Sequence, residues 1–341
     1  MPEPQGLASF DHLRELLAAI PGPDAAALAD AEEREPMLTK PPGSLGRLEL
    51  IAHWLAAWQG RHPPSVENIA VRVFAGNHGV VARGVSAYPA EVTAQMVGNF
   101  AAGGAAVNQL CRSVGADLDV IALDLDTPTA DFTEAPAMSE VEFLDAVGRG
   151  MAAVPEGADL LCVGEMGIGN TTSAAALALG LYGGDARDWT GPGTGVVGEA
   201  YKLKVSAVGD AVRHHAPHLG DGMEALRRLG GRELAAMVGA ILQARLTRVP
   251  VLLDGYVAGA AAASLAASAP GALDHCLAAH ISTEPGHRRL LDELRLTPLV
   301  DMNMRLGEAS GAVLAAAIVK SAAACHTGMA TFAEAGVSDK D

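Results

Sequence analysis

The segment 158–181 constrains the fold of this chain most strongly. It reads ADLLCVGEMGIGNTTSAAALALGL. A short apolar run, 160–163, ends at Gly164, and two further glycines precede an alanine- and leucine-rich stretch that ends near Gly180. High helix propensity in that stretch, placed after an apolar run and a glycine cluster, predicts a buried strand, a tight turn and a helix.

The glycine turn is a candidate ligand site. A backbone without side chains can approach a ligand closely, and the free N–H groups at the start of a helix favour an anion. Glu165 lies inside this turn. Its carboxylate would repel a phosphate that it touched, so we expect it to face a sugar or a reacting base. A purely structural glycine turn is the alternative.

The turn differs from the common nucleotide-binding motifs. Gly164 and Gly169 have the G-x-x-x-x-G spacing of a P-loop, but Asn170 occupies the position of the lysine that reaches the β- and γ-phosphates. The dinucleotide pattern G-x-G-x-x-G also fails, because Thr172 stands at the place of its last glycine. The spacing therefore argues against a triphosphate site.

Further short apolar runs recur along the chain. Strands are expected from Ile69 to Val73 and over 118–123, 160–163, 249–253 and 276–281, with helical segments between them. This alternation predicts an α/β fold with a Rossmann-like, mostly parallel sheet flanked by helices. Ligands of such sheets bind beyond the carboxyl ends of the strands. We therefore expect five loops to contribute to one site: GNHG, DLD, GEMGIGN, DGY and STEPGH.

Helical spacing of apolar residues predicts helices over 7–20 and 46–59, and small residues predict a helix over 309–325. The turn-dense connector 39–46 is either a linker or a loop whose Lys40 or Ser44 reaches the active site.

Composition and charge limit the partners of this chain. Its 341 residues carry a net charge of −16, which argues against nucleic acid and anionic membranes as partners. Any phosphate must then be held by local dipoles and one or two cations. The four cysteines are far apart and form no C-x-x-C, which predicts free thiols in a reducing compartment. The N-terminus has no signal segment, and apolar runs break before about 18 residues, so we expect a cytoplasmic protein.

Several polar residues are candidates for binding or catalysis. Lys204 is a candidate phosphate ligand, although a lysine on an exposed helix would give the same pattern. His214, His215 and His218 have no carboxylate or cysteine partner at ligand spacing, so a solvated loop is expected there and no metal site. The loop 191–195, GPGTG, is an ordinary surface loop by spacing alone.

Glu308 lies among apolar and small residues, just before the predicted C-terminal helix. Apolar surroundings disfavour the charged carboxylate and raise its pKa towards the range of a general base. A glutamate stabilised by the dipole of the first helical turn is the equal alternative.

Six segments, in one order along nearly the whole chain, carry a resemblance to a known family. They are KPPGSLGRLE (40–49), AGNHGVVARGVSAYPAEVTAQMV (75–97), GEMGIGNTTSAAA (164–176), GPGTG (191–195), EPGHRRLLDEL (284–294) and DMNMRLGEASGA (301–312). The chain resembles the nicotinate-nucleotide:5,6-dimethylbenzimidazole phosphoribosyltransferases, pentosyltransferases that make α-ribazole phosphate for the lower ligand of cobalamin. The match is weakest around 283–287, where the family varies.

The resemblance implies a reaction and its site residues. The base attacks C1′ of nicotinate mononucleotide, nicotinate leaves, and the configuration at C1′ inverts. Glu308 would remove a proton from the attacking base, and Glu165 would lie near the ribose and the base. The implied substrate-binding residues are Ser86, Tyr88, Gln95, Met166 and Leu306 around the base, and Gly167, Gly169, Asn170, Thr171, Thr172, Gly193 and Lys204 at the turn and the phosphate. Neither a cofactor nor a metal is implied, because the pyridinium is already a good leaving group.

The resemblance also implies a homodimer with a small helical domain built from both chain ends. It would divide the chain into 1–66 and 301–341, which form the small domain, and the sheet domain 67–300. Two other functions stay open on the sequence: a non-catalytic protein that binds α-ribazole or a nucleotide, and a purine-type phosphoribosyltransferase whose acidic pair grips Mg²⁺. The base could be dimethylbenzimidazole, another benzimidazole or a purine, because a flat apolar slot discriminates weakly.

Overall fold

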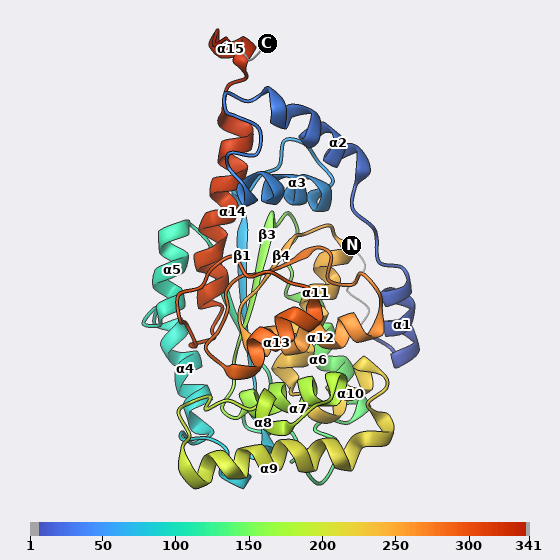
Figure 1. Cartoon of the computed structure of the whole chain (residues 1–341). Helices are drawn as coiled ribbons and strands as arrows, with labels where there is room; N and C mark the ends of the chain where they lie inside the picture. The colour runs from blue at the N-terminus through green and yellow to red at the C-terminus, as the bar shows by residue number, and fades with distance from the viewer. Residues whose placement is uncertain (1–6, 339–341) are drawn as a thin grey trace.

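A parallel sheet with helices on both faces organises the chain (Figure 1). The computed structural model describes residues 7–338, so the start of the chain, where no signal segment is expected, lies largely outside the described residues. Within that range the sheet has five strands in the order β2-β1-β3-β4-β5, all parallel. This arrangement confirms the predicted α/β class and the parallel sheet.

The strands are β1 (Ile69–Ala75), β2 (Asp117–Ala122), β3 (Leu160–Met166), β4 (Val251–Leu253) and β5 (Cys276–Ala278). The helices up to the middle of the chain are α1 (Phe10–Ala18), α2 (Ala25–Arg34), η1 (Glu35–Met37), α3 (Arg47–Gln59), η2 (Gly79–Arg83), α4 (Glu91–Ala101), α5 (Ala106–Val114), α6 (Glu140–Ala152) and α7 (Asn170–Tyr182). Those that follow are α8 (Ala186–Trp189), α9 (Gly198–His215), η3 (Ala216–His218), α10 (Gly222–Leu229), α11 (Arg232–Leu246), α12 (Tyr256–Ser268), α13 (Pro285–Leu294), α14 (Ser310–Gly328) and α15 (Phe332–Ala335).

Two hydrophobic cores cover the two faces of the sheet. Ala70 and Phe74 of β1 pack into the core shared with α6, α7, α11 and α12. Val71 and Val73 of the same strand pack into the opposite core, shared with α3, α5 and α14. The alternation follows from the two-residue period of a strand, and burial on both faces explains why these strands read as continuous apolar runs.

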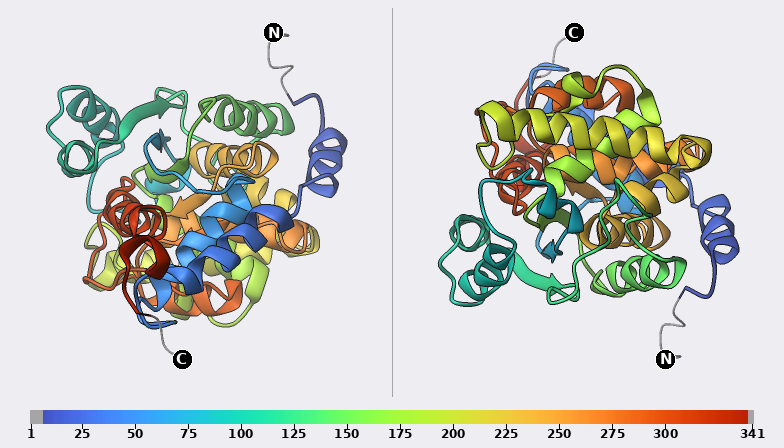
Figure 2. Two further views of the ribbon diagram at one scale, coloured as in Figure 1. Left: turned by 90° about the horizontal axis from the view of Figure 1, so that it is seen from above. Right: turned by 90° about the horizontal axis from the view of Figure 1, so that it is seen from below.

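The ends of the chain meet away from the strand termini that carry the predicted loops. α2 and α3 pack beside α14 at one end of the molecule, and α9 lies across the other end (Figure 1). α1 lies on the outer edge beside α6, where Phe10 stacks on Phe143 with ring centroids 5.1 Å apart (Figure 2). Within residues 1–66, α2 and α3 are thus the helices that join α14, and the division into domains stays a proposal.

Two expectations need correction. The 276–281 strand ends at Ala278, because the chain leaves the sheet and Ile281 donates to the Val300 carbonyl instead (3.0 Å). His215 is not in a solvated loop: it ends α9, is buried, and bonds through Nε2 to the Phe132 carbonyl (2.9 Å), whereas His214 and His218 are exposed.

α14 bears on the expectation that no segment spans a membrane. It is 19 residues long and, by length and composition alone, apolar enough to cross one, although Lys320 interrupts its apolar run. Half of that stretch is buried inside the protein, where its small residues pack on α3 and the sheet. Such burial is typical of a core helix.

The start of α14 lies directly on β3. A side chain at Gly164 would overlap the backbone of Ala309, and the Glu308 amide donates to the Glu165 carbonyl (3.1 Å). Glycine is therefore required within a buried strand at this point, because only a bare backbone admits the other chain segment.

We predict that Gly164→Ala lowers the free energy of unfolding by about 1–3 kcal/mol through overpacking. Gly98→Ala is the matched control: Gly98 lies inside α4 with open space within 4 Å among the described residues, so alanine should stabilise by about 0.5–1 kcal/mol. Urea unfolding of the two variants measures both effects, and equal stabilities would contradict the close approach.

Candidate active site

A cavity of roughly 440 Å³ opens beyond the carboxyl ends of β3, β4 and β5. This is the size of a small-molecule site. The apolar part of its lining is formed by Tyr88, Val92, Met96, Met166, Ile168, Val257 and Leu306. The remainder of the lining is polar or glycine: Glu165, Gly167, Asn170, Thr171, Gly193, Thr194, Gly255, Tyr256, His280, Ser282, Glu284, Arg305, Gly307 and Glu308.

Most of the sequence-predicted residues meet in this cavity. Those that line it are Glu165, Glu308, Tyr88, Met166, Gly167, Asn170, Thr171, Gly193 and Leu306. They come from 88–96, the β3–α7 turn, the 191–195 loop and the segment before α14. The predicted strand, glycine turn and helix are present, with Gly169 as the N-cap of α7 at φ 96°.

Five predicted residues do not line the cavity. Gln95 is exposed, because the cavity faces the side of α4 that carries Val92 and Met96. Ser86 lies with its hydroxyl oxygen 3.3 Å from that of Thr194, which does line the cavity.

Gly169 and Thr172 lie behind the turn, where Gly169 packs on Val81 and Thr172 is fully buried. Lys204 is the fifth of these residues. It does not line the cavity itself but contacts Thr171, which does.

Two of the five expected loops are absent from the described cavity lining. Asn77 of GNHG donates to the Leu125 carbonyl in DLD (2.9 Å), so these loops bind one another. His78 points away into the core, where it contacts Glu233 and Ser173. The connector 39–46 is also structural, since Lys40 is buried in ion pairs with Glu35 and Glu49 and Ser44 is exposed.

Glu165 is held in a low-dielectric position at the end of β3. It is 9% exposed, and its Oε2 accepts from the Asn170 side chain in the first turn of α7. Burial raises its pKa well above the ordinary value, and the nearby carboxylates of Asp254, Glu233 and Glu308 raise it further. The ionisation of this carboxyl group is therefore sensitive to any positive charge that enters the cavity.

Glu308 projects from a backbone in the left-handed region. Gly307, Glu308 and Ala309 have φ values of 80°, 62° and 59°. Non-glycine residues in this region cost free energy, and such residues cluster at functional sites. Burial raises the pKa of Glu308 to about 7, with a smaller contribution from Asp254. A carboxylate with this pKa suits general base catalysis near neutral pH.

Asp254, at the end of β4, organises the start of α14. Its Oδ1 accepts from the Ala312 amide (2.9 Å) and lies 3.6 Å from Nδ1 of His280. α14 has no side-chain cap of its own. The Asp254 carboxylate, which comes from a neighbouring strand, therefore accepts a hydrogen bond from one of the free amides at the start of the helix. The sequence marked the DGY loop only as polar, because Asp254 and α14 are far apart along the chain.

A buried cation lies behind the turn. The Lys204 ammonium donates to Thr171 Oγ1 (2.8 Å) and to the Gly191 carbonyl (2.9 Å). Burial lowers its pKa to about 8, with Glu284 acting in the opposite direction, so Lys204 is mostly protonated at neutral pH. It fixes the 191–195 loop against α7, which shows that this loop is more than an ordinary surface turn.

Two charged residues that the sequence analysis did not identify line the cavity beside the 191–195 loop. Arg305 brings a guanidinium to the lining and donates to the Gly193 carbonyl (3.3 Å). Glu284 accepts a hydrogen bond from the Gly193 amide (2.9 Å), so that N–H already has a partner. Both lie within segments that carry the family resemblance, which was the available signal for them.

The comparisons with known proteins agree with this arrangement. A family model described as phosphoribosyltransferase matches residues 20–337. The chain belongs to this phosphoribosyltransferase family. It is therefore an enzyme, and the resemblance seen in the sequence motifs is confirmed.

Relatives and solved structures cover nearly all of this phosphoribosyltransferase. The nicotinate-nucleotide–dimethylbenzimidazole phosphoribosyltransferase of Rhizobium meliloti (strain 1021) is 61% identical over 332 residues, 97% of this chain and 98% of the relative. The enzyme of the same name from Sinorhizobium medicae (strain WSM419) is 62% identical over 331 residues, again 97% and 98%. The crystal structure of CobT from Thermus thermophilus is 43% identical with a TM-score of 0.87, covering 92% of this chain and 100% of that one.

We predict that Glu165→Gln stabilises the phosphoribosyltransferase at neutral pH. A raised pKa in the folded state means that the carboxylate destabilises the fold once pH rises above the unfolded pKa of about 4.3. The melting temperature of the variant should equal that of the wild type near pH 4 and exceed it by about 2 °C or more at pH 7. Thermal unfolding from pH 4 to 8 measures this, with the exposed Glu32→Gln as control. A difference independent of pH would contradict the assigned shift.

Proposed function

We propose that this enzyme transfers the phosphoribosyl group of nicotinate mononucleotide to 5,6-dimethylbenzimidazole or a related base, releasing nicotinate and α-ribazole 5′-phosphate. The observation that carries the proposal is the meeting of Glu165 and Glu308 at one cavity with an apolar wall. The printed names of the relatives, at about 60% identity, supply the two substrates.

The cavity offers groups that suit both substrates. Its apolar residues match a flat aromatic base, which gains free energy by leaving water. Thr171 and Arg305 suit the phosphate, where the guanidinium supplies charge directly. Lys204 adds positive charge from behind Thr171, which places a cation near the phosphate in a strongly acidic protein.

Glu308 acts as the general base in this proposal. As the base nitrogen attacks C1′, its ring N–H becomes acidic, and the carboxylate takes the proton. Attack from the face opposite to nicotinate inverts C1′, so the β-nucleotide gives an α-product. A pKa of about 7 lets Glu308 accept the proton at neutral pH without being permanently protonated.

Glu165 stabilises the sugar as it loses nicotinate. The transition state carries positive charge on the ribose, and a buried carboxylate beside it interacts more strongly than one in water. The Asn170 amide holds this carboxylate in place. Nicotinate leaves with a neutral pyridine ring, so the remaining task of the protein is to position the reactants.

A product assay tests the reaction. Nicotinate mononucleotide is incubated with the enzyme, with and without dimethylbenzimidazole, and the products are separated by chromatography. The proposal expects nicotinate release that requires the base, and an α-configured product by NMR. Binding of the base without release would favour a non-catalytic role, and activity abolished by EDTA at a temperature where the protein stays folded would favour an Mg²⁺-dependent transferase.

We predict that Glu308→Gln lowers kcat by about 10²–10⁴-fold, the range for loss of a general base, with little change in the KM for the nucleotide. The Glu32→Gln variant serves as control. In the wild type, kcat should fall as pH drops through about 7, because the carboxylate becomes protonated. Steady-state kinetics from pH 5.5 to 9 measure both effects, and an unchanged kcat in the variant removes Glu308 from the mechanism.

The family resemblance further implies a homodimer, and we carry this as part of the proposal. Light scattering coupled to size-exclusion chromatography measures the mass in solution. A mass of twice 34.8 kDa is expected, and a mass of one chain at micromolar concentration would contradict it.

A further inference from the structure

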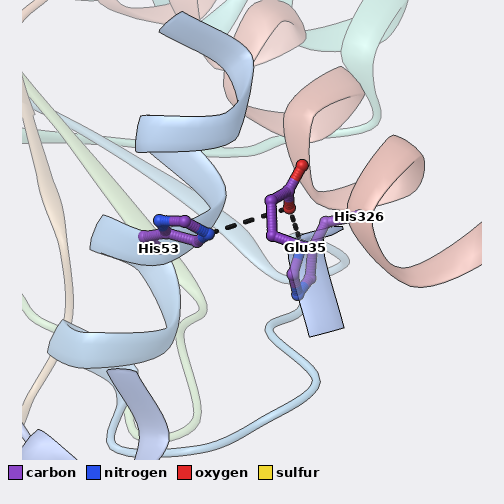
Figure 3. A group of neighbouring side chains, drawn as sticks. All are labelled: Glu35, His53 and His326. Carbon is purple, nitrogen blue, oxygen red and sulfur yellow. Dashed lines mark hydrogen bonds and ion pairs between the residues drawn. The ribbon is translucent and has the colours of Figure 1, made fainter. Parts of the chain in front are cut away.

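A cluster of histidines and a glutamate lies where the two ends of the chain meet, away from the cavity. Glu35 comes from η1, His53 from α3 and His326 from the last turns of α14, and the three side chains converge (Figure 3). One ligand atom of each lies within 4.8 Å of the other two. Glu35 Oε2 is 2.6 Å from His326 Nδ1 and 3.7 Å from His53 Nε2.

We propose that Glu35, His53 and His326 form a binding site for a divalent transition metal of the zinc class. Two imidazoles and one carboxylate are a donor set that zinc accepts, with a fourth position left for water. The transfer reaction does not enter this inference, which rests on side chains remote from the cavity.

The state of His53 is the first argument. Its Nε2 is buried and has no hydrogen-bond partner among the described residues. A buried polar atom without a partner costs free energy, so its retention calls for a ligand. The atom points towards Glu35 Oε2, at a distance too long for a hydrogen bond but suited to two ligands of one ion.

The surrounding contacts orient the three ligands. The Lys40 ammonium binds the other oxygen of Glu35, Oε1, at 2.8 Å. Oε2 is hydrogen-bonded to His326 Nδ1 (2.6 Å), and a bound ion would replace this hydrogen bond. Nε2 of His326 lies 3.1 Å from Nε2 of His62, so His326 can donate there while Nδ1 faces the ion. A histidine that binds a metal through one nitrogen almost always donates from the other.

Backbone contacts fix the position of His326. The Arg34 guanidinium, one residue before Glu35, donates to the carbonyls of His326 (3.0 Å) and Met329 (2.9 Å). Leu38 also forms an antiparallel bridge with Thr331. The ligands from distant parts of the sequence are therefore held in register before any ion binds.

The charge of the groups around the cluster favours a cation. Lys40 compensates one of the two carboxylates that it contacts, Glu35 and Glu49. One negative charge is left over, which a divalent ion would more than neutralise.

The ion would act as a cross-link between η1, α3 and the end of α14. Glu308 precedes the other end of α14, roughly 27 Å away at 1.5 Å per residue. We therefore expect metal to change stability with little direct effect on chemistry. An ion that binds only the folded state raises the melting temperature by mass action.

The test uses full-length, tag-free enzyme stripped with EDTA and then titrated with ZnCl₂. We expect one zinc per chain by isothermal titration and a rise in melting temperature of several degrees. His53→Gln is the decisive variant: since Nε2 makes no hydrogen bond in the described structure, the metal-free variant should melt near the wild type, yet bind zinc at least tenfold more weakly. His218→Gln, at an exposed histidine, is the matched control and should bind as the wild type does.

Zinc binding unaffected by His53→Gln, or no stoichiometric binding to the wild type, would overturn the proposal and leave a hydrogen-bonded cluster only. If the variant does not fold, zinc-edge anomalous diffraction from wild-type crystals decides: a peak between Glu35, His53 and His326 supports the site, and a peak elsewhere or none rejects it.

Discussion

The active site depends on one close contact, in which the start of α14 packs against the backbone of β3 at Gly164. Gly164 admits Ala309, the Glu308 amide donates to the Glu165 carbonyl, and two acidic side chains from residues far apart in the sequence reach one cavity. The left-handed backbone at Glu308 and Ala309 accompanies this approach. Asp254 secures it from the next strand by accepting from a first-turn amide of the helix.

This arrangement concentrates negative charge where water is scarce. Glu165, Glu308 and Asp254 all have raised pKa values, chiefly because burial disfavours each charge. Such a cluster opposes folding at neutral pH and, in the proposed mechanism, favours a cationic transition state. The site is therefore expected to be less stable than an apolar one of the same shape, a common cost of function. Two positive groups lie near the 191–195 loop: Arg305 lines the cavity and donates to the Gly193 carbonyl, and Lys204 lies behind Thr171.

Local patterns in the sequence predicted what depends on local physics. The period of apolar residues indicated the strands, and the glycines with the following small residues indicated the turn and the start of α7. Side chains whose role depends on contacts across the fold could not be read in this way. Gln95 and Met96 are adjacent in α4, yet only Met96 lines the cavity, because helix phase was not fixed by sequence alone. His215 resembled a surface residue until the Phe132 carbonyl, 83 positions away, supplied its partner.

The proposed reaction requires the two carboxylates to meet at the carbon that undergoes transfer. A crystal structure of the Glu308→Gln enzyme with nicotinate mononucleotide and dimethylbenzimidazole tests this most directly. We expect the substituted side chain within hydrogen-bond distance of the ring N–H of the base, Glu165 beside the ribose, and the phosphate between Thr171 and Arg305. A nucleotide bound with its anomeric carbon remote from both side chains would contradict the proposed mechanism.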